Sequence, residues 1–113
     1  SPLASGRCAR PGWEADTMRS KTDTTARGKY DSTEEQDKAI SARIYELARK
    51  YGATMTAITF AWHFKKGVSS PIVGATKTKY LDDAVAAFDV SLTDEDVAYI
   101  DELYVPHKIV GAL

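Results

Sequence analysis

The chain has 113 residues, of which 43% are hydrophobic and 27% are charged. This length suits one small domain, and the apolar content is too high for a disordered chain. The formal net charge is -1, from 15 basic and 16 acidic residues. No basic excess favours nucleic acid or a membrane surface, so we expect neither as a partner.

Cys8 is the one cysteine of the sequence, so no internal disulfide can form. This favours a reducing compartment, and we expect a cytoplasmic protein. No apolar stretch approaches the ~20 residues of a membrane helix, and no signal-peptide pattern is found. The chain begins with SPL rather than Met, which we interpret as the inside of a longer protein.

Residues 7–31 are polar, with few apolar residues and no hydrophobic period. A structureless run of this length is usually functional or disordered, and we predict a long surface loop. Residues 32–113 are predicted to hold helices, one strand and a tail.

Two helices are predicted after this loop. The sequence STEE at 32–35 fits a capping box, and apolar residues recur at helical spacing as far as Tyr51, ahead of a C-terminal cap at Gly52. A second helix is predicted from about Thr54 to Gly67. The first helix has a charged outer face, whereas the second is apolar around most of its circumference and should be well buried.

The segment 68–74 is β-rich and bounded by glycine, which predicts one buried strand, and residues 1–4 fit the end of another. A third helix is predicted from about Thr78 to Phe88. A fourth begins after a T-x-x-D cap at Thr93 and stops at Pro106. Two short parallel strands cannot stand alone. The chain is therefore either a small helical domain or a fragment of a larger α/β fold, and the buried second helix favours the fragment.

Two segments have the character of an anion site. Residues 73–78 run from a strand through a glycine turn into a helix N-terminus, where backbone N–H groups and the helix dipole favour negative charge. The small turn at 1–6 follows the other strand end. Either segment alone reads as an ordinary turn. Together they match the phosphate sites that α/β barrels build after strands 7 and 8.

At these residues the chain resembles the C-terminal part of the aldo-keto reductases. The matching sequences are SPLASG at 1–6, PIVGATK at 71–77 and AAFDVSLT at 86–93, with ELARKYG at 46–52 and AW at 61–62. The resemblance covers nearly the whole chain and is weakest over 8–31. The ending YVPHKIVG at 104–111 resembles the fungal reductases of the aryl-alcohol and versiconal type.

The resemblance implies an α/β fold, namely the C-terminal portion of a (β/α)8 TIM barrel with strands 7 and 8, their helices and two extra helices. It also implies an NADPH-dependent reductase of aldehydes or ketones. By similarity, the turn at 1–6 would line the pyrophosphate, the 74–77 segment the ribose and its 2′-phosphate, and the third helix the adenine. In that order the implied cofactor-binding residues are Ser1, Leu3, Ser5 and Gly6; Gly74, Ala75, Thr76 and Lys77; and Tyr80 and Asp83.

The sequence departs from the family at three positions. Many members have Arg in place of Tyr80, and Glu-Asn in place of Asp83 and Ala84. The family's catalytic Asp, Tyr, Lys and His come from earlier strands that this sequence lacks. We therefore predict no catalytic or metal-binding residue here and an inactive fragment. His63 and Cys8 are predicted to have no role in catalysis, while Trp13 either lines the substrate pocket or anchors the loop.

Two alternatives remain open. Potassium-channel β-subunits share the barrel and bind the same cofactor as regulatory partners, so the chain could belong to a non-catalytic NADPH-binding module. It could also be an independent small helical interaction domain. The small carbonyl substrate and the oligomeric state cannot be identified from these residues.

Overall fold

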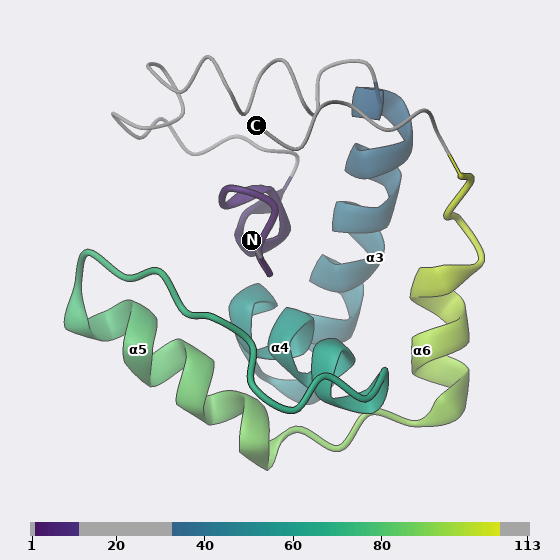
Figure 1. Ribbon diagram of the computed structural model, residues 1–113. Coiled ribbons are helices and arrows are strands. Elements are labelled where there is room, and N and C mark those ends of the chain that lie inside the picture. The colour runs from purple at the N-terminus through teal and green to yellow at the C-terminus, as the bar shows by residue number, and fades with distance from the viewer. Residues whose placement is uncertain (1, 12–32, 107–113) are drawn as a thin grey trace.

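A computed structural model describes residues 2–11 and 33–106 of the chain. Helix α4 is the central element of these residues and contacts α3, α5 and two short 3-10 helices (Figure 1). Helix α6 packs on the outer side of α3. No helix in the described ranges is long and apolar enough to cross a membrane. The elements in chain order are η1 (Arg7–Ala9), α3 (Glu34–Tyr51), α4 (Met55–Lys65), α5 (Thr78–Val85), η4 (Ala86–Asp89) and α6 (Asp94–Asp101).

Helix α3 confirms the first predicted helix and its C-terminal cap. Gly52 adopts a left-handed conformation with φ 61°, and its N–H donates to the carbonyl oxygens of Ala48 and Arg49. Glycine is favoured there because a Cβ disfavours positive φ. At the other end, Thr33 makes no side-chain capping bond. The Ser32 half of the predicted capping box lies outside the described residues.

Helix α4 is as deeply buried as its composition predicts. The hydroxyl oxygen of Thr54 accepts a hydrogen bond of 3.1 Å from the N–H of Ala57, which caps the helix. The residues from Met55 to Ala61 are all buried, and Ile58 is 0% exposed. The core around α4 consists of Ile44, Leu47, Ala48, Met55, Ile58, Phe60, Ala61, Ala84, Ala87, Leu92 and Ile100.

Helix α6 begins at the predicted cap. Thr93 and Asp96 form a capping box, in which each side chain accepts a hydrogen bond from the other residue's backbone N–H. Asp96 also accepts bonds from the Lys50 ammonium group at 2.8 Å and from the Tyr51 hydroxyl. This buried carboxylate therefore caps α6 and joins it to the end of α3.

The predicted strands are absent from residues 2–11 and 33–106. Residues 2–6 form a turn, and the segment 68–74 has no regular structure, with Ile72 82% exposed. A parallel strand needs hydrogen-bonding neighbours, and a strand pair alone is unstable in water. The described residues provide no such neighbour for 68–74.

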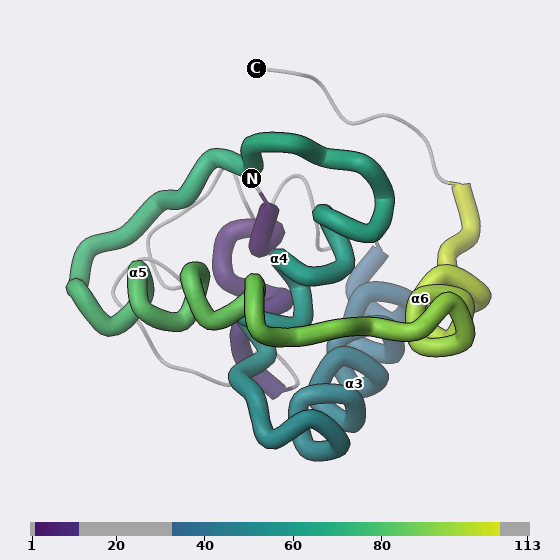
Figure 2. Tube along the Cα trace, turned by 90° about the horizontal axis from the view of Figure 1, so that it is seen from below, coloured from purple at the N-terminus to yellow at the C-terminus, as the bar shows by residue number. Residues whose placement is uncertain are grey.

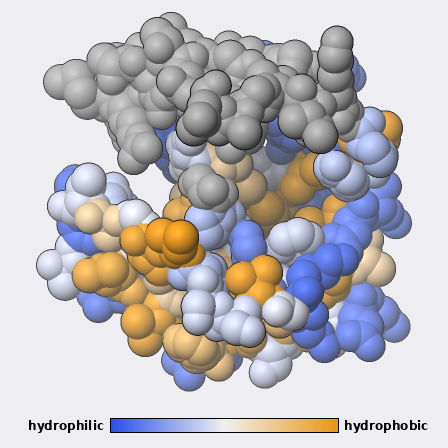
Figure 3. Space-filling model, viewed as in Figure 1, coloured by the Kyte–Doolittle hydropathy of each residue, from blue (hydrophilic) through white to orange (hydrophobic). Residues whose placement is uncertain are grey.

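The third predicted helix is present as α5, and it exposes apolar side chains to solvent. Helix α5 ends at Val85 and continues as the 3-10 helix η4. Leu81, Val85 and Phe88 are exposed. The Phe88 ring stacks on the ring of Phe64, with the ring centroids 5.0 Å apart. Figure 3 shows apolar side chains gathered over α5 and the segment before it.

The start of the predicted long loop is not a loop. Residues Arg7–Ala9 form η1, which packs against α3 and α4. The remainder of that prediction, residues 12–31 with Trp13, lies outside the described residues.

Candidate functional site

The turn before η1 has an unusual backbone. Ala4, Ser5 and Gly6 have φ angles of 48°, 58° and 89°, so three successive residues are left-handed. This conformation disfavours residues with a Cβ by about 1–2 kcal/mol each, and such strain tends to occur at functional sites. The carbonyl oxygen of Leu3 accepts hydrogen bonds from the N–H groups of Gly6 and Cys8, at 3.0 and 3.1 Å. The Gly6 N–H is therefore used by the turn itself.

Buried hydroxyl groups hold η1 in place. The Ser41 hydroxyl of α3, which is 1% exposed, lies 3.2 Å from the carbonyl oxygen of Arg7 and 3.1 Å from that of Arg10. The Thr59 hydroxyl of α4 donates to the carbonyl oxygen of Cys8 at 3.0 Å. Since these carbonyl groups face the helices, the backbone of residues 7–10 is fixed on both.

The Arg10 side chain folds back over this turn. A Cβ added at Gly6 would lie 3.2 Å from Nη2 of Arg10, so the guanidinium rests on the Gly6 backbone. Burial lowers the pKa of Arg10, the charge of Arg7 lowers it further, and Tyr80 acts in the opposite direction. The Arg10 guanidinium is therefore held next to the backbone of the Gly6 turn.

The second predicted segment leads into the N-terminus of α5. Residues 74–79 are exposed, and Lys77 is the N-cap residue, with extended backbone and no side-chain capping bond. Its carbonyl oxygen accepts from the N–H of Tyr80 at 3.1 Å. The first turn of α5 carries no acidic residue. The positive end of the helix dipole and Lys77 are thus both open to solvent, as an anion site requires.

The two segments belong to elements that pack on the same helix. Both η1 and α5 contact α4, and Figure 2 shows the chain before α5 as a long arc that leads from the end of α4 to α5. Tyr80 lies in the first turn of α5 and is exposed. Asp83 is half-buried one turn further along α5, and the adjacent Ala84 is buried, so the small size of Ala84 is explained by packing. Ser1 lies outside the described residues.

Sequence reasoning missed Arg10. It is one of several basic residues in 7–31, and no local pattern distinguishes it from the others. Its position depends on the left-handed turn and on contacts with Ser41 of α3, more than 30 residues away.

His63 and Cys8, which are predicted to have no role in catalysis, both make contacts within the fold. Nδ1 of His63 lies 2.7 Å from the carbonyl oxygen of Thr59 in its own helix. Burial raises the pKa of the Cys8 thiol to about 11, so the reactive thiolate is disfavoured. In the described part of the chain no group of His, Cys, Asp and Glu could hold a metal ion.

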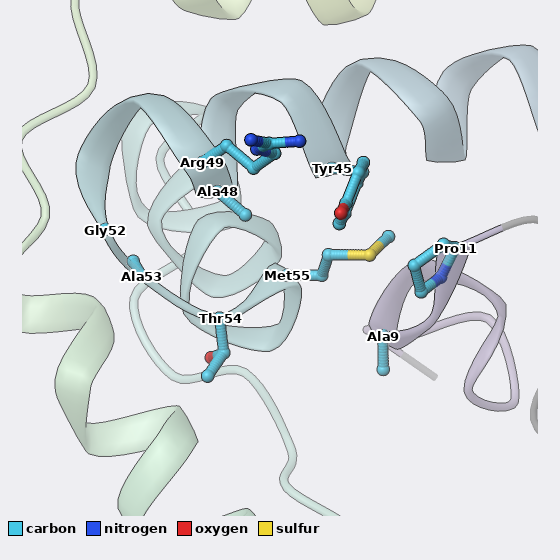
Figure 4. A pocket seen from close by; sticks show the side chains of 9 residues that line it. All are labelled: Ala9, Pro11, Tyr45, Ala48, Arg49, Gly52, Ala53, Thr54 and Met55. Atoms are coloured by element: carbon cyan, nitrogen blue, oxygen red, sulfur yellow. The ribbon is translucent and has the colours of Figure 1, made fainter.

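Two hollows lie among the helices. One of about 530 Å³ lies between α3, α4 and α6, where Asp101 accepts from Trp62 at 2.8 Å and from Lys66 at 2.6 Å. The other, of about 370 Å³, lies between η1, α3 and the start of α4 (Figure 4). The larger hollow is also lined by Pro2 of the 1–6 turn, and neither hollow is lined by residues 74–77.

Comparison with known proteins identifies the class. The Aldo/keto reductase family model matches residues 1–105. A versiconal hemiacetal acetate reductase of Aspergillus parasiticus is 40% identical over 110 residues, which is 96% of this chain and 32% of that protein. A putative aryl-alcohol dehydrogenase of Schizosaccharomyces pombe is 40% identical over 114 residues, 100% of this chain and 32% of that protein.

The chain belongs to the aldo/keto reductase family. Both the family and the fungal branch expected from the residues are confirmed. The chain spans about a third of the length of the curated relatives it matches. In this family it corresponds to a segment of a (β/α)8 barrel.

Proposed function

We propose that this chain forms the cofactor-binding end of an NADPH-dependent oxidoreductase that reduces aldehydes or ketones to alcohols. One observation carries the proposal: the Arg10 guanidinium lies over the left-handed turn at Gly6, and the N-terminus of α5, with Lys77, is exposed and has no side-chain cap. The names of the relatives, a reductase and a dehydrogenase, are consistent with this reaction class.

In the proposed complex the pyrophosphate lies against Ser1, Leu3, Ser5 and Gly6. The 2′-phosphate lies at the 74–77 segment, where Lys77 provides the positive charge. The adenine packs on Tyr80, and the carboxylate of Asp83 accepts a hydrogen bond from its amino group. Bound NADPH would supply the hydride. The residues of this chain bind and orient the cofactor, and we assign none of them to proton transfer.

Lys77 provides the direct test. In the full-length protein, Lys77→Ala is expected to weaken NADPH binding about tenfold, since a charge-assisted contact contributes roughly 1.5–3 kcal/mol. NADH lacks the 2′-phosphate, so its binding should change little. The measurement is the dissociation constant of each cofactor by calorimetric titration.

Lys38→Ala is the matched control, because Lys38 is an exposed lysine on α3 paired with Glu34 at 2.6 Å. This variant should bind both cofactors as the wild type does. Equal losses for NADPH and NADH in Lys77→Ala would refute the assignment of Lys77 to the 2′-phosphate.

A second candidate function is an independent helical interaction domain, which the shared core of α3, α4 and α6 favours. This candidate predicts cooperative folding with no response to NADPH.

A regulatory module similar to the channel β-subunits would instead bind NADPH without reducing a carbonyl. Turnover of a small aldehyde by the full-length protein separates that module from the reductase. We propose a cytoplasmic location for either.

A further inference from the structure

The strongest unassigned feature is the position of the Arg10 guanidinium. It covers the backbone of Gly6, where an added Cβ would lie 3.2 Å from Nη2 of Arg10. Gly6 is thus restricted twice, by its φ of 89° and by the guanidinium above it. The turn proposed to face the pyrophosphate therefore already carries a cation.

The backbone beneath Arg10 is fixed before any ligand binds. Its carbonyl oxygen is held by Ser41 at 3.1 Å, and that of Cys8 is held by Thr59 at 3.0 Å. Both hydroxyl residues are buried on separate helices. A side chain mounted on such a support loses little conformational freedom on binding, which favours affinity.

The chemistry of the surroundings suits an anion with more than one charge. Two arginines, Arg7 and Arg10, lie within the four residues that follow the turn. The planar guanidinium donates two parallel N–H bonds to phosphate oxygens, which an ammonium group cannot do. A pyrophosphate presents such oxygens on both of its phosphate groups.

We propose that Arg10 binds the pyrophosphate of the dinucleotide at the Gly6 turn. This inference rests on the proposed function, because it requires the dinucleotide to occupy the site. Since NADPH and NADH share the pyrophosphate, Arg10 contributes equally to both, whereas Lys77 distinguishes between them.

The test compares NADPH and NADH dissociation constants for the wild type, Arg10→Gln and Arg10→Lys in the full-length protein. Arg10→Gln should weaken the binding of both cofactors by about tenfold or more. The affinity of Arg10→Lys should lie between those of the wild type and Arg10→Gln, because lysine keeps the positive charge but cannot donate two parallel N–H bonds. Arg49→Gln, which removes an exposed arginine of α3 outside the site, should bind like the wild type.

Unchanged affinity in Arg10→Gln, or a loss confined to NADPH, would overturn the pyrophosphate assignment while leaving the proposed function intact. An equal loss in Arg49→Gln would overturn it as well, because the effect would then be one of net charge. A wild-type protein that binds neither cofactor would overturn both proposals.

A labelling experiment on the wild type covers the case in which Arg10→Gln does not fold. Phenylglyoxal modifies arginine, and peptide mass mapping reports each position separately. NADPH and NADH should each protect Arg10 and leave Arg49 reactive. Equal labelling of Arg10 with and without cofactor would overturn the inference.

Discussion

At the residue scale, the buried Asp96 carboxylate caps α6 and accepts hydrogen bonds from Lys50 and Tyr51 at the end of α3. Burial raises its pKa, but hydrogen bonds from Lys50, Tyr51 and the Thr93 backbone together lower it well below the ordinary value of 3.8. Its side chain is 6% exposed. A buried charge of this kind is stabilising only because its partners are all in place.

Asp96→Ala should lower the free energy of unfolding by about 2–4 kcal/mol, since it removes a helix cap and two charge-assisted bonds. Asp96→Asn keeps a side chain that accepts the capping bond and should lose about half as much. Urea denaturation of the full-length protein measures both. A loss below about 0.5 kcal/mol in Asp96→Ala would show that the cluster does not stabilise the fold.

Acidic pH should remove the contribution of Asp96 to the free energy of unfolding. Because the pKa of Asp96 is lowered in the folded state, its contribution is present above the unfolded value of 3.8 and is lost as the pH falls towards the folded value. Between pH 5 and pH 3 the wild type should therefore lose more stability than Asp96→Asn. Parallel losses in the two proteins would contradict this assignment.

At the element scale, α4 illustrates why some helices can be predicted closely. Its cap, the Thr54 bond to Ala57, and its continuous apolar run are encoded within a dozen residues. The capping box of α6 is equally local. Burial of α4 follows because a helix that is apolar all round has no solvent-compatible face.

Thr54→Ala should cost about 1 kcal/mol of stability, the usual effect of deleting an N-cap acceptor, while Thr54→Ser keeps a hydroxyl and should cost little. Chemical denaturation of the two variants side by side checks this. If the variants were equally stable, the cap would have no energetic importance for α4.

The elements that were mispredicted depend on residues far away or outside the chain. The 68–74 segment has strand composition, yet strand pairing needs neighbours that the described residues do not supply. The apolar side chains of α5 remain exposed for the same reason. Arg10 escaped prediction because its place over Gly6 depends on a turn held by α3 and α4.

At the scale of the whole molecule, apolar side chains are exposed both before and after α5 in the sequence. Ile72, 82% exposed, and Phe88, 73% exposed, lie on either side of the α5 N-terminus in the sequence. In a (β/α)8 barrel, strands are flanked by strands and helices by helices. The exposure of this surface is what a barrel segment without its neighbouring units should show.

The central claim is that this chain provides an NADPH site, and a thermal melt of the full-length protein tests it most directly. A ligand that binds only the folded state raises the melting temperature. At NADPH concentrations about 100 times the dissociation constant, we predict an upward shift of roughly 5 °C or more, with a smaller shift for NADH at the same concentration. A cooperative melt that does not move at saturating NADPH would contradict the claim and favour the helical interaction domain.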